Sequence, residues 1–142
     1  MAKVVITGRI PAIAVEQLRA QHDVVSWDEP VVITREKWLK RGKGADAIVS
    51  LLTEKVDAEL LDAAGPQLKV VSNVAVGYNN IDVPACKERN VLVTNTPGVL
   101  TEATADIAMA LILMSTRRLA EGERVIRKQE PWQWGMFYML GS

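Results

Sequence analysis

Cysteine, histidine and phenylalanine each occur only once among the 142 residues of this chain. A single cysteine, Cys86, excludes an intrachain disulfide framework and is typical of a reducing compartment. The only histidine, His22, lies where a strand-like run begins rather than where one ends, so we interpret it as a surface residue and not as a general base. Because cysteine and histidine are so scarce and no paired acidic motif occurs, the sequence predicts no metal site.

The chain also lacks a net charge and a long apolar run. Lys and Arg together number 17, as do Asp and Glu, so no overall field attracts nucleic acid or anionic lipid. Met1 to Lys3 lead directly into Val4–Ile6, with no signal-like segment. The longest apolar region, Ala103–Met114, is interrupted by Asp106 and falls short of the ~20 residues that span a membrane. We expect a cytoplasmic protein without nucleic-acid or membrane partners.

What the sequence does have is a regular alternation of short β-branched runs with amphipathic stretches. Such an alternation with short connections predicts an α/β fold: a flavodoxin-like, doubly wound, five-stranded parallel sheet over residues 1–98. The expected strands centre on Val4–Ile6, Val24–Val25, Ala47–Val49, Val70–Val71 and Val91–Val93. The expected helices cover Pro11–Ala20, Arg35–Lys40, Ala58–Ala64 and Val83–Arg89.

Three of these helices have recognisable starts. Thr34, Asp57 and Asp82 are residue types that cap helix N-termini through their side chains. Each is flanked by an apolar pair that could form a hydrophobic staple. The pairs are Ile33 with Trp38, Val56 with Leu61, and Ile81 with Cys86.

A different pattern begins after residue 98. One long helix is expected over Thr101–Lys128, capped by Thr101, with a bend or break expected near Gly122. Every residue of Ile107–Met114 is apolar, so one small domain could cover only one face of this helix. We interpret residues 99–142 as a docking helix, for a second domain or a second subunit, followed by the aromatic segment Trp132–Tyr138. A long core helix is the alternative.

The most informative segment for chemistry follows the fourth expected strand. Ligands of open α/β sheets bind beyond the carboxyl ends of the strands. There, Gly77 would let the backbone turn sharply and approach a ligand, so that the N–H groups of Val76 and Gly77 converge on a small carboxylate. An ordinary glycine turn is the alternative. Gly42-Lys43-Gly44 follows a helix instead of a strand and is interpreted as a helix stop, not a dinucleotide fingerprint.

Three segments together resemble the D-2-hydroxyacid dehydrogenases, and within them the glyoxylate/hydroxypyruvate reductases. The segments are Val74-Ala75-Val76-Gly77-Tyr78-Asn79-Asn80-Ile81-Asp82, Val91-Leu92-Val93-Thr94-Asn95-Thr96-Pro97-Gly98 and Leu100-Thr101-Glu102-Ala103-Thr104-Ala105-Asp106. The resemblance extends over essentially the whole chain. It implies an enzyme that reduces 2-oxo acids to D-2-hydroxy acids with NAD or NADP as cofactor.

The resemblance also implies roles for particular residues. The backbone amides of Val76 and Gly77 hold the substrate carboxylate, Leu52 lines the substrate pocket, and Thr104 and Val76 lie near the nicotinamide. The long helix forms much of a homodimer contact. Trp134 is the candidate for an aromatic side chain that reaches into the partner's pocket.

The family pattern continues beyond this chain. Its dinucleotide-binding loop, its carboxylate-clamping arginine and its histidine acid/base would all follow Ser142. We therefore expect no catalytic residue here, no cofactor bound by this chain alone, and a substrate-domain fragment that is inactive alone. The alternative is a stand-alone flavodoxin-like module that dimerises without catalysis. A signalling receiver does not fit, because Thr7-Gly8 and Ser50 stand where receivers carry acidic residues.

Overall fold

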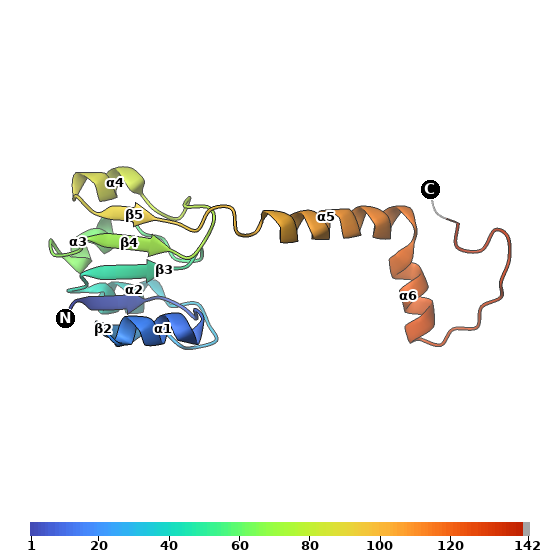
Figure 1. The fold of residues 1–142 in the computed structure, drawn as a ribbon, viewed down its shortest axis with the longest axis horizontal. Coiled ribbons are helices and arrows are strands. Elements are labelled where there is room, and N and C mark those ends of the chain that lie inside the picture. The colour runs from blue at the N-terminus through green and yellow to red at the C-terminus, as the bar shows by residue number, and fades with distance from the viewer. Residues whose placement is uncertain (141–142) are drawn as a thin grey trace. The chain divides into compact units, whose positions relative to one another are not determined.

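Five short strands form the centre of the first part of the chain, in a computed structural model that describes residues 1–140. They all run parallel in the order β2-β1-β3-β4-β5 (Figure 1). Their bounds are β1 Lys3–Ile6, β2 Asp23–Ser26, β3 Ala47–Ser50, β4 Val70–Asn73 and β5 Leu92–Thr94. The predicted α/β class and the five-stranded parallel sheet are confirmed, and each strand lies within two residues of its expected place.

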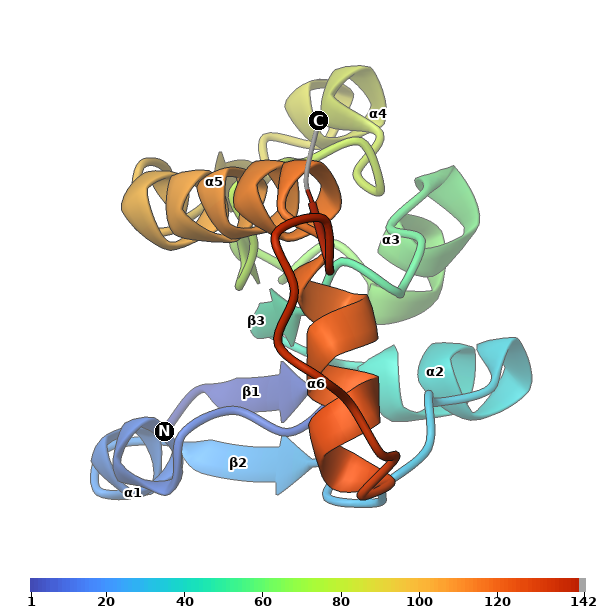
Figure 2. The same ribbon diagram turned by 90° about the vertical axis from the view of Figure 1, so that its right-hand side faces the viewer.

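Four helices connect these strands. They are α1 Ala12–Arg19, α2 Arg35–Gly42, α3 Ala58–Ala64 and α4 Val83–Glu88. Helices α2, α3 and α4 lie side by side over one face of the sheet, and α1 lies on the other face (Figure 2). All four were predicted, with ends that differ by no more than two residues.

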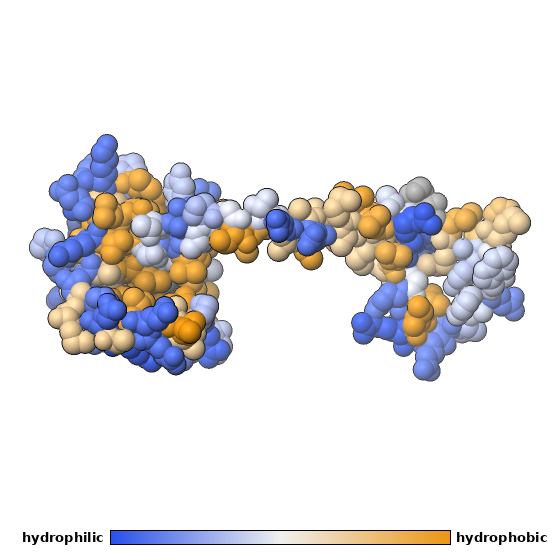
Figure 3. Space-filling view, viewed as in Figure 1, coloured by the Kyte–Doolittle hydropathy of each residue, from blue (hydrophilic) through white to orange (hydrophobic). Residues whose placement is uncertain are grey.

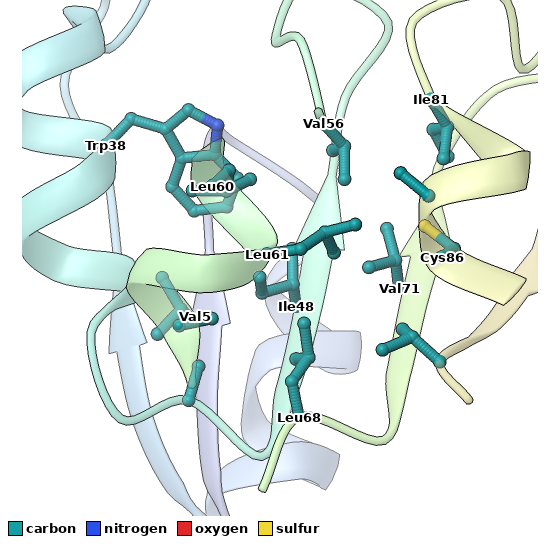
Figure 4. Close-up of a cluster of buried hydrophobic side chains, with 14 of the residues drawn as sticks. Val5, Trp38, Ile48, Val56, Leu60, Leu61, Leu68, Val71, Ile81 and Cys86 are labelled. Atoms are coloured by element: carbon teal, nitrogen blue, oxygen red, sulfur yellow. The ribbon is translucent and has the colours of Figure 1, made fainter. Parts of the chain in front are cut away.

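The hydrophobic core lies under α2, α3 and α4. Trp38, Leu60 and Cys86 come from these three helices and meet strand residues such as Ile48 and Val71 (Figure 4). All five are at most 2% exposed. Burial of each large apolar side chain contributes about 1.5–3 kcal/mol, so this face supplies most of the stability of the unit. Burial also raises the pKa of the Cys86 thiol, with a smaller contribution from the nearby Asp82 carboxylate, so Cys86 is a packing residue.

All three predicted N-cap residues stand at the N-caps of their helices. The Asp57 carboxylate accepts a hydrogen bond from the Leu60 amide, and the Asp82 carboxylate accepts one from the Ala85 amide. Thr34 is the N-cap residue of α2, but its side chain makes no capping hydrogen bond. A hydroxyl can rotate to other partners, whereas an ionised carboxylate is an obligatory acceptor beside a positive helix end.

A separate unit begins at Val99 and, over its described residues 99–140, contains two helices. They are α5, Thr101–Thr116, and α6, Leu119–Arg127. The predicted single helix over Thr101–Lys128 was therefore wrong. The chain breaks at Arg118, which adopts a left-handed backbone with φ of 54°, and not at Gly122, which lies inside α6.

Hydroxyl groups at the end of α5 account for the position of this break. Thr116 Oγ1 donates to the Ile112 carbonyl at 2.9 Å, and Ser115 Oγ donates to the same carbonyl at 2.9 Å. Such bonds compete with the backbone amides for helical carbonyls and bend a helix. Beyond the break, the guanidinium of Arg118 binds the Glu121 carboxylate at 2.7 Å, which stabilises the start of α6.

The start of α5 also differs from the expectation. Leu100, not Thr101, is the N-cap residue, and no side chain caps the helix. Helix α5 has no buried residue, and Figure 3 shows apolar side chains along it. Between residues 1 and 140, no helix combines the length and apolar character that crossing a membrane requires.

Candidate functional site

Three neighbouring strands end on buried polar residues at the carboxyl edge of the sheet. Thr7 follows β1 and is 1% exposed, while Ser50 ends β3 and Asn73 ends β4, both fully buried. Ser50 and Asn73 are paired in register, and the Ser50 hydroxyl donates to Asn73 Oδ1 at 2.9 Å. A layer of hydroxyl and amide groups therefore separates the apolar core from the loops beyond the strands.

A buried carboxylate fixes the loop after β3. Glu54 is 4% exposed and accepts hydrogen bonds from Thr7 Oγ1 at 2.7 Å, from the Leu51 amide at 2.8 Å, and from Thr53 Oγ1. These three neutral donors replace the water that the carboxylate loses on burial. These hydrogen bonds hold the loop on its buried side. Leu52, which was predicted to line the substrate pocket, lies in this loop and is 58% exposed.

The Asn80 side chain joins this loop to the loop after β4. Its Nδ2 atom donates to the Leu51 carbonyl at 3.1 Å and to the Glu54 carbonyl at 3.0 Å. Its Oδ1 atom accepts from Asn73 Nδ2 at 3.1 Å, and the same Asn73 nitrogen donates to the Gly77 carbonyl at 2.9 Å. The segment with Leu52 and the segment with Gly77 are thus parts of one hydrogen-bonded assembly.

The amides of Val76 and Gly77 have no acceptor within the described part of the chain. The other amides of residues 75–80 likewise have no acceptor there, whereas the Val74 amide before them is bonded to the Ser50 carbonyl at 2.8 Å. Both Val76 and Gly77 are exposed. Consecutive unpaired N–H groups at an exposed carboxyl edge can bind an anion, as the sequence predicted for this segment.

The backbone bends at residues 74–76, directly before Gly77. The φ of Gly77 itself is outside the left-handed region, where Gly44, Gly65 and Gly98 lie. A Cβ atom on Gly77 would meet no atom within 4 Å. The fold of this chain does not itself require glycine here, so the absence of a side chain keeps space open above the amides.

A hollow of about 310 Å³ opens beside the same edge of the sheet. Thr7, Leu51 and Glu54 form its inner side, and the exposed side chains of Val31 and Val32 form part of its rim. It therefore combines apolar walls with hydrogen-bonding groups. The glycines of Gly42-Lys43-Gly44 lie elsewhere, at the end of α2, where the left-handed Gly44 donates its amide to the Ala64 carbonyl.

The other predicted site residues belong to the second unit. Thr104 is exposed in the first turn of α5 and its amide donates to the Leu100 carbonyl. Trp134 is 86% exposed, whereas Trp132 stacks on Tyr138 with ring centroids 6.1 Å apart. Of these two tryptophans, Trp134 is the one with a free indole ring.

The role of Thr7, Ser50 and Asn73 in supporting the loops was not predicted from the sequence. Thr7 and Ser50 follow apolar runs directly, and Asn73 follows one after Ser72, so a polar residue where each of three strands ends was the available signal. His22, predicted on the surface, is half-buried and precedes β2, so it lies at the amino edge of the sheet. In residues 1–140, no group of three or more His, Cys, Asp or Glu side chains is placed to hold a metal ion.

Comparison with known proteins shows the family of this chain. Residues 4–135 match the family model described as D-isomer specific 2-hydroxyacid dehydrogenase, catalytic domain. The glyoxylate reductase of Thermococcus kodakarensis is 47% identical over 128 residues, which cover 90% of this chain and 38% of that protein. The glyoxylate reductase of Aeropyrum pernix is 41% identical over 143 residues, with 98% of this chain and 42% of that protein covered.

Solved structures give the same result. A crystal structure of a protein from Thermus thermophilus has a TM-score of 0.90 and 36% identity, covering 98% of this chain and 44% of that one. The NADPH-dependent glyoxylate/hydroxypyruvate reductase of Sinorhizobium meliloti has a TM-score of 0.67 and 30% identity, covering 89% of this chain and 38% of that one. The chain spans less than half the length of these relatives. It belongs to the D-isomer specific 2-hydroxyacid dehydrogenase family.

Proposed function

We propose that this chain is the substrate-carboxylate-binding part of an NAD(P)H-dependent reductase that converts glyoxylate or hydroxypyruvate to the D-2-hydroxy acid. The observation that carries the proposal is the pair of unpaired amides at Val76 and Gly77, exposed at the carboxyl edge of the sheet. The relatives named above as glyoxylate reductases support this substrate class. The Sinorhizobium meliloti structure contains malonate, a small carboxylic acid, and NADP.

In this proposal the residues of the chain bind and orient the substrate. The carboxylate accepts hydrogen bonds from the Val76 and Gly77 amides, and the exposed Leu52 side chain contacts the carbon chain of the acid. Hydrogen bonds to a charged group contribute about 1.5–3 kcal/mol each, enough to hold a small acid in one orientation. Fixing that orientation converts a bimolecular encounter into a positioned reaction.

The chain fits only one end of the cofactor. Val76 and Thr104 both have exposed side chains that could contact the nicotinamide. Bound NADH or NADPH would supply the hydride. We propose that the phosphates of the cofactor and the proton donor are held by a further part of a longer protein, as the 38% coverage of the Thermococcus relative suggests. This chain alone would then be inactive and would bind no cofactor.

We further propose a homodimer in the cytoplasm, formed through α5. The absence of any buried residue in α5 supports an interface there, and the free indole of Trp134 suits insertion into a partner's pocket. The unpaired, buried thiol of Cys86 agrees with a reducing compartment. A non-catalytic dimerisation module is the second candidate, favoured by α5 alone, and it differs in binding no 2-oxo acid.

A chimera tests the main proposal. The matched segment of the Thermococcus kodakarensis glyoxylate reductase is replaced by the corresponding residues of this chain. We expect the chimera to oxidise NADH or NADPH when glyoxylate or hydroxypyruvate is added, and the 142-residue chain to give no turnover. A folded chimera that binds cofactor but reduces neither acid would contradict the substrate assignment. Turnover by the chain alone would contradict the fragment assignment.

A matched pair of variants connects activity to the amides. In the chimera, Gly77→Val fills the open space above them, while Val74→Ala changes a neighbouring residue whose amide is already paired. Losing one or two hydrogen bonds to a carboxylate should raise KM roughly ten- to a hundredfold for Gly77→Val. Val74→Ala should leave KM within a factor of about three. Equal KM values for the two variants would exclude Val76 and Gly77 as the carboxylate site.

A further inference from the structure

Two consecutive carbonyl groups of the loop after β4 are held by the segment that follows β5. The Ala75 carbonyl accepts a hydrogen bond from the Thr96 amide at 2.9 Å. The next carbonyl, that of Val76, accepts one from Asn95 Nδ2 at 2.8 Å. Two neighbouring residues, Asn95 and Thr96, therefore hold two neighbouring peptide groups of the loop.

These bonds fix the direction of the unpaired amides. A trans peptide is planar, and its C=O and N–H bonds point in opposite directions. The chain contains no cis peptide bond in its described part. The peptide group that carries the Val76 carbonyl also carries the Gly77 N–H, and the group that carries the Ala75 carbonyl carries the Val76 N–H. Both N–H groups therefore point away from the β5 end.

Asn95 differs from the other polar residues of this edge. Asn73 is fully buried and takes part in the network that also holds Ser50 and Asn80, so it supports the fold itself. Asn95 is half-exposed, and the hydrogen bond to the Val76 carbonyl is the one its side chain makes with the described residues. The side-chain amide of Asn95 therefore orients one peptide group of the loop and does not contribute to the core.

We propose that Asn95 is a positioning residue for 2-oxo acid binding: by holding the Val76 carbonyl, it keeps the Gly77 N–H directed at the substrate carboxylate. The proposal rests on the proposed function of the Val76 and Gly77 amides. Without the Asn95 amide, the peptide group between Val76 and Gly77 can rotate, and the substrate loses a donor that is oriented before it arrives. Preorganised donors bind more tightly because no ordering cost remains to be met on binding.

The test compares Asn95→Ala with Thr94→Val in the 142-residue chain. Thr94 is the neighbouring residue, and its hydroxyl donates to Ser72 Oγ at 3.0 Å, outside the loop. Each variant thus removes one exposed side-chain hydrogen bond without a change of charge. Backbone ¹⁵N–¹H residual dipolar couplings report the orientation of the Gly77 N–H, and titration with oxamate, a stable analogue of a 2-oxo acid, reports binding through the Val76 and Gly77 amide shifts.

We expect Asn95→Ala to change the Gly77 coupling and to weaken oxamate binding about tenfold, the effect of one lost hydrogen bond. Thr94→Val should change neither. An unchanged Gly77 coupling and dissociation constant in Asn95→Ala would overturn the role of Asn95 while the carboxylate site stands. If oxamate leaves the wild-type Val76 and Gly77 shifts unperturbed, the proposed function itself fails.

A measurement on the wild-type chain keeps the proposal testable if Asn95→Ala does not fold. A scalar coupling through the hydrogen bond, between Asn95 ¹⁵Nδ2 and the Val76 ¹³C carbonyl, is expected. Its absence in a well-resolved spectrum would show that the Asn95 amide does not hold this peptide group, and the inference would be wrong.

Discussion

The two units of this chain differ in how deeply their apolar side chains are buried. In the sheet unit, Leu60 of α3 is fully buried, together with Ile48 and Val71 from the strands. In the helical unit, Leu111 of α5 is 60% exposed and Ile107 is 63% exposed. The same residue type therefore stabilises one unit and leaves the other with an uncovered surface.

The difference shows which unit is complete. The sheet unit has its own core, so its side chains already have the neighbours that they need. Helix α5 is as apolar as a core helix but has no buried residue. Exposed apolar surface of this kind marks an interaction site. We therefore propose that the sheet unit forms the carboxylate site with its own residues, and that α5 is covered by a partner surface.

The largest expected effect comes from truncating a core leucine of the sheet unit, and a leucine of α5 provides the comparison. Leu60→Ala should destabilise the sheet unit by about 2–5 kcal/mol, because it leaves a cavity in the core. At chain concentrations low enough for the monomer to predominate, Leu111→Ala should cost less than about 0.5 kcal/mol, because the side chain is exposed in the single chain. Urea unfolding monitored by circular dichroism measures both. Similar losses for the two variants would mean that α5 is packed in solution and would break the comparison.

A pair of glycines sharpens the comparison within the sheet unit. A Cβ atom on Gly8 would lie 2.3 Å from Leu51 Cδ1, while one on Gly77 would meet nothing within 4 Å. Gly8→Ala should therefore destabilise by about 1 kcal/mol, because the Leu51 side chain must leave its rotamer. Gly77→Ala should change stability by less than about 0.5 kcal/mol. A strongly destabilised Gly77→Ala would show that this glycine serves the fold, and the open space would lose its significance for binding.

Removing the cap of α3 should have a smaller effect, which depends on pH. Partial burial opposes ionisation of Asp57, but hydrogen bonds from Arg35, at 2.5 Å, and from the Leu60 amide outweigh it, and the pKa of Asp57 is lowered. Asp57→Ala should cost about 1 kcal/mol at neutral pH. Thr34→Ala is the control, because the Thr34 side chain makes no capping bond, and it should change stability by only a few tenths of that amount.

The sign of the pH dependence follows from the lowered pKa. The folded chain binds the Asp57 proton less tightly than the unfolded chain, whose aspartates titrate near 3.9. The stabilising contribution is therefore complete above that value and is lost as the pH falls through the folded pKa. Asp57→Asn should lose less stability than the wild type over this acid range. Parallel pH profiles of the two proteins would exclude the ion pair with Arg35 as the cause.

A charged residue on α5 should weaken self-association and should change the free energy of unfolding least among these variants. Leu111→Glu places a carboxylate on the exposed apolar helix and should leave the unfolding free energy within about 0.5 kcal/mol. In sedimentation equilibrium the wild type should self-associate, and the variant should dissociate at a concentration at least about tenfold higher. Glu102→Gln, in the polar first turn of α5, is the control. A wild-type chain that stays monomeric at high concentration would contradict the dimer proposal.

The sequence was sufficient to predict the sheet unit because its local signals agree with its packing. Apolar runs such as Val4–Ile6 are short and rich in β-branched residues, and Asp57 both resembles a cap and acts as one. The helix over Thr101–Lys128 was predicted from its cap, the charges at its ends and its apolar pattern, and none of these includes the hydroxyls of Ser115 and Thr116. Gly122 has a lower propensity than either residue, yet the break occurs where side-chain hydrogen bonds compete with the backbone.

The candidate site was predictable only at its surface. Val76 and Gly77 are recognisable because their segment resembles a known family and contains a glycine after a strand. The residues that hold the loops, such as Glu54, Asn80 and Asn95, are distant in the sequence from the groups that they bind. Long-range hydrogen bonds of this kind depend on strand order and register, which no local pattern contains.

The bridging side chain of Asn80 has a consequence for substrate size. Because its amide reaches the Leu51 and Glu54 carbonyls while its oxygen contacts Asn73, the loop with Leu52 and the loop with Gly77 keep a fixed separation. If the substrate lies between these loops, as we propose, the width available to it is set by one interior side chain of fixed length. Acids of different bulk could be selected by residues that never touch them.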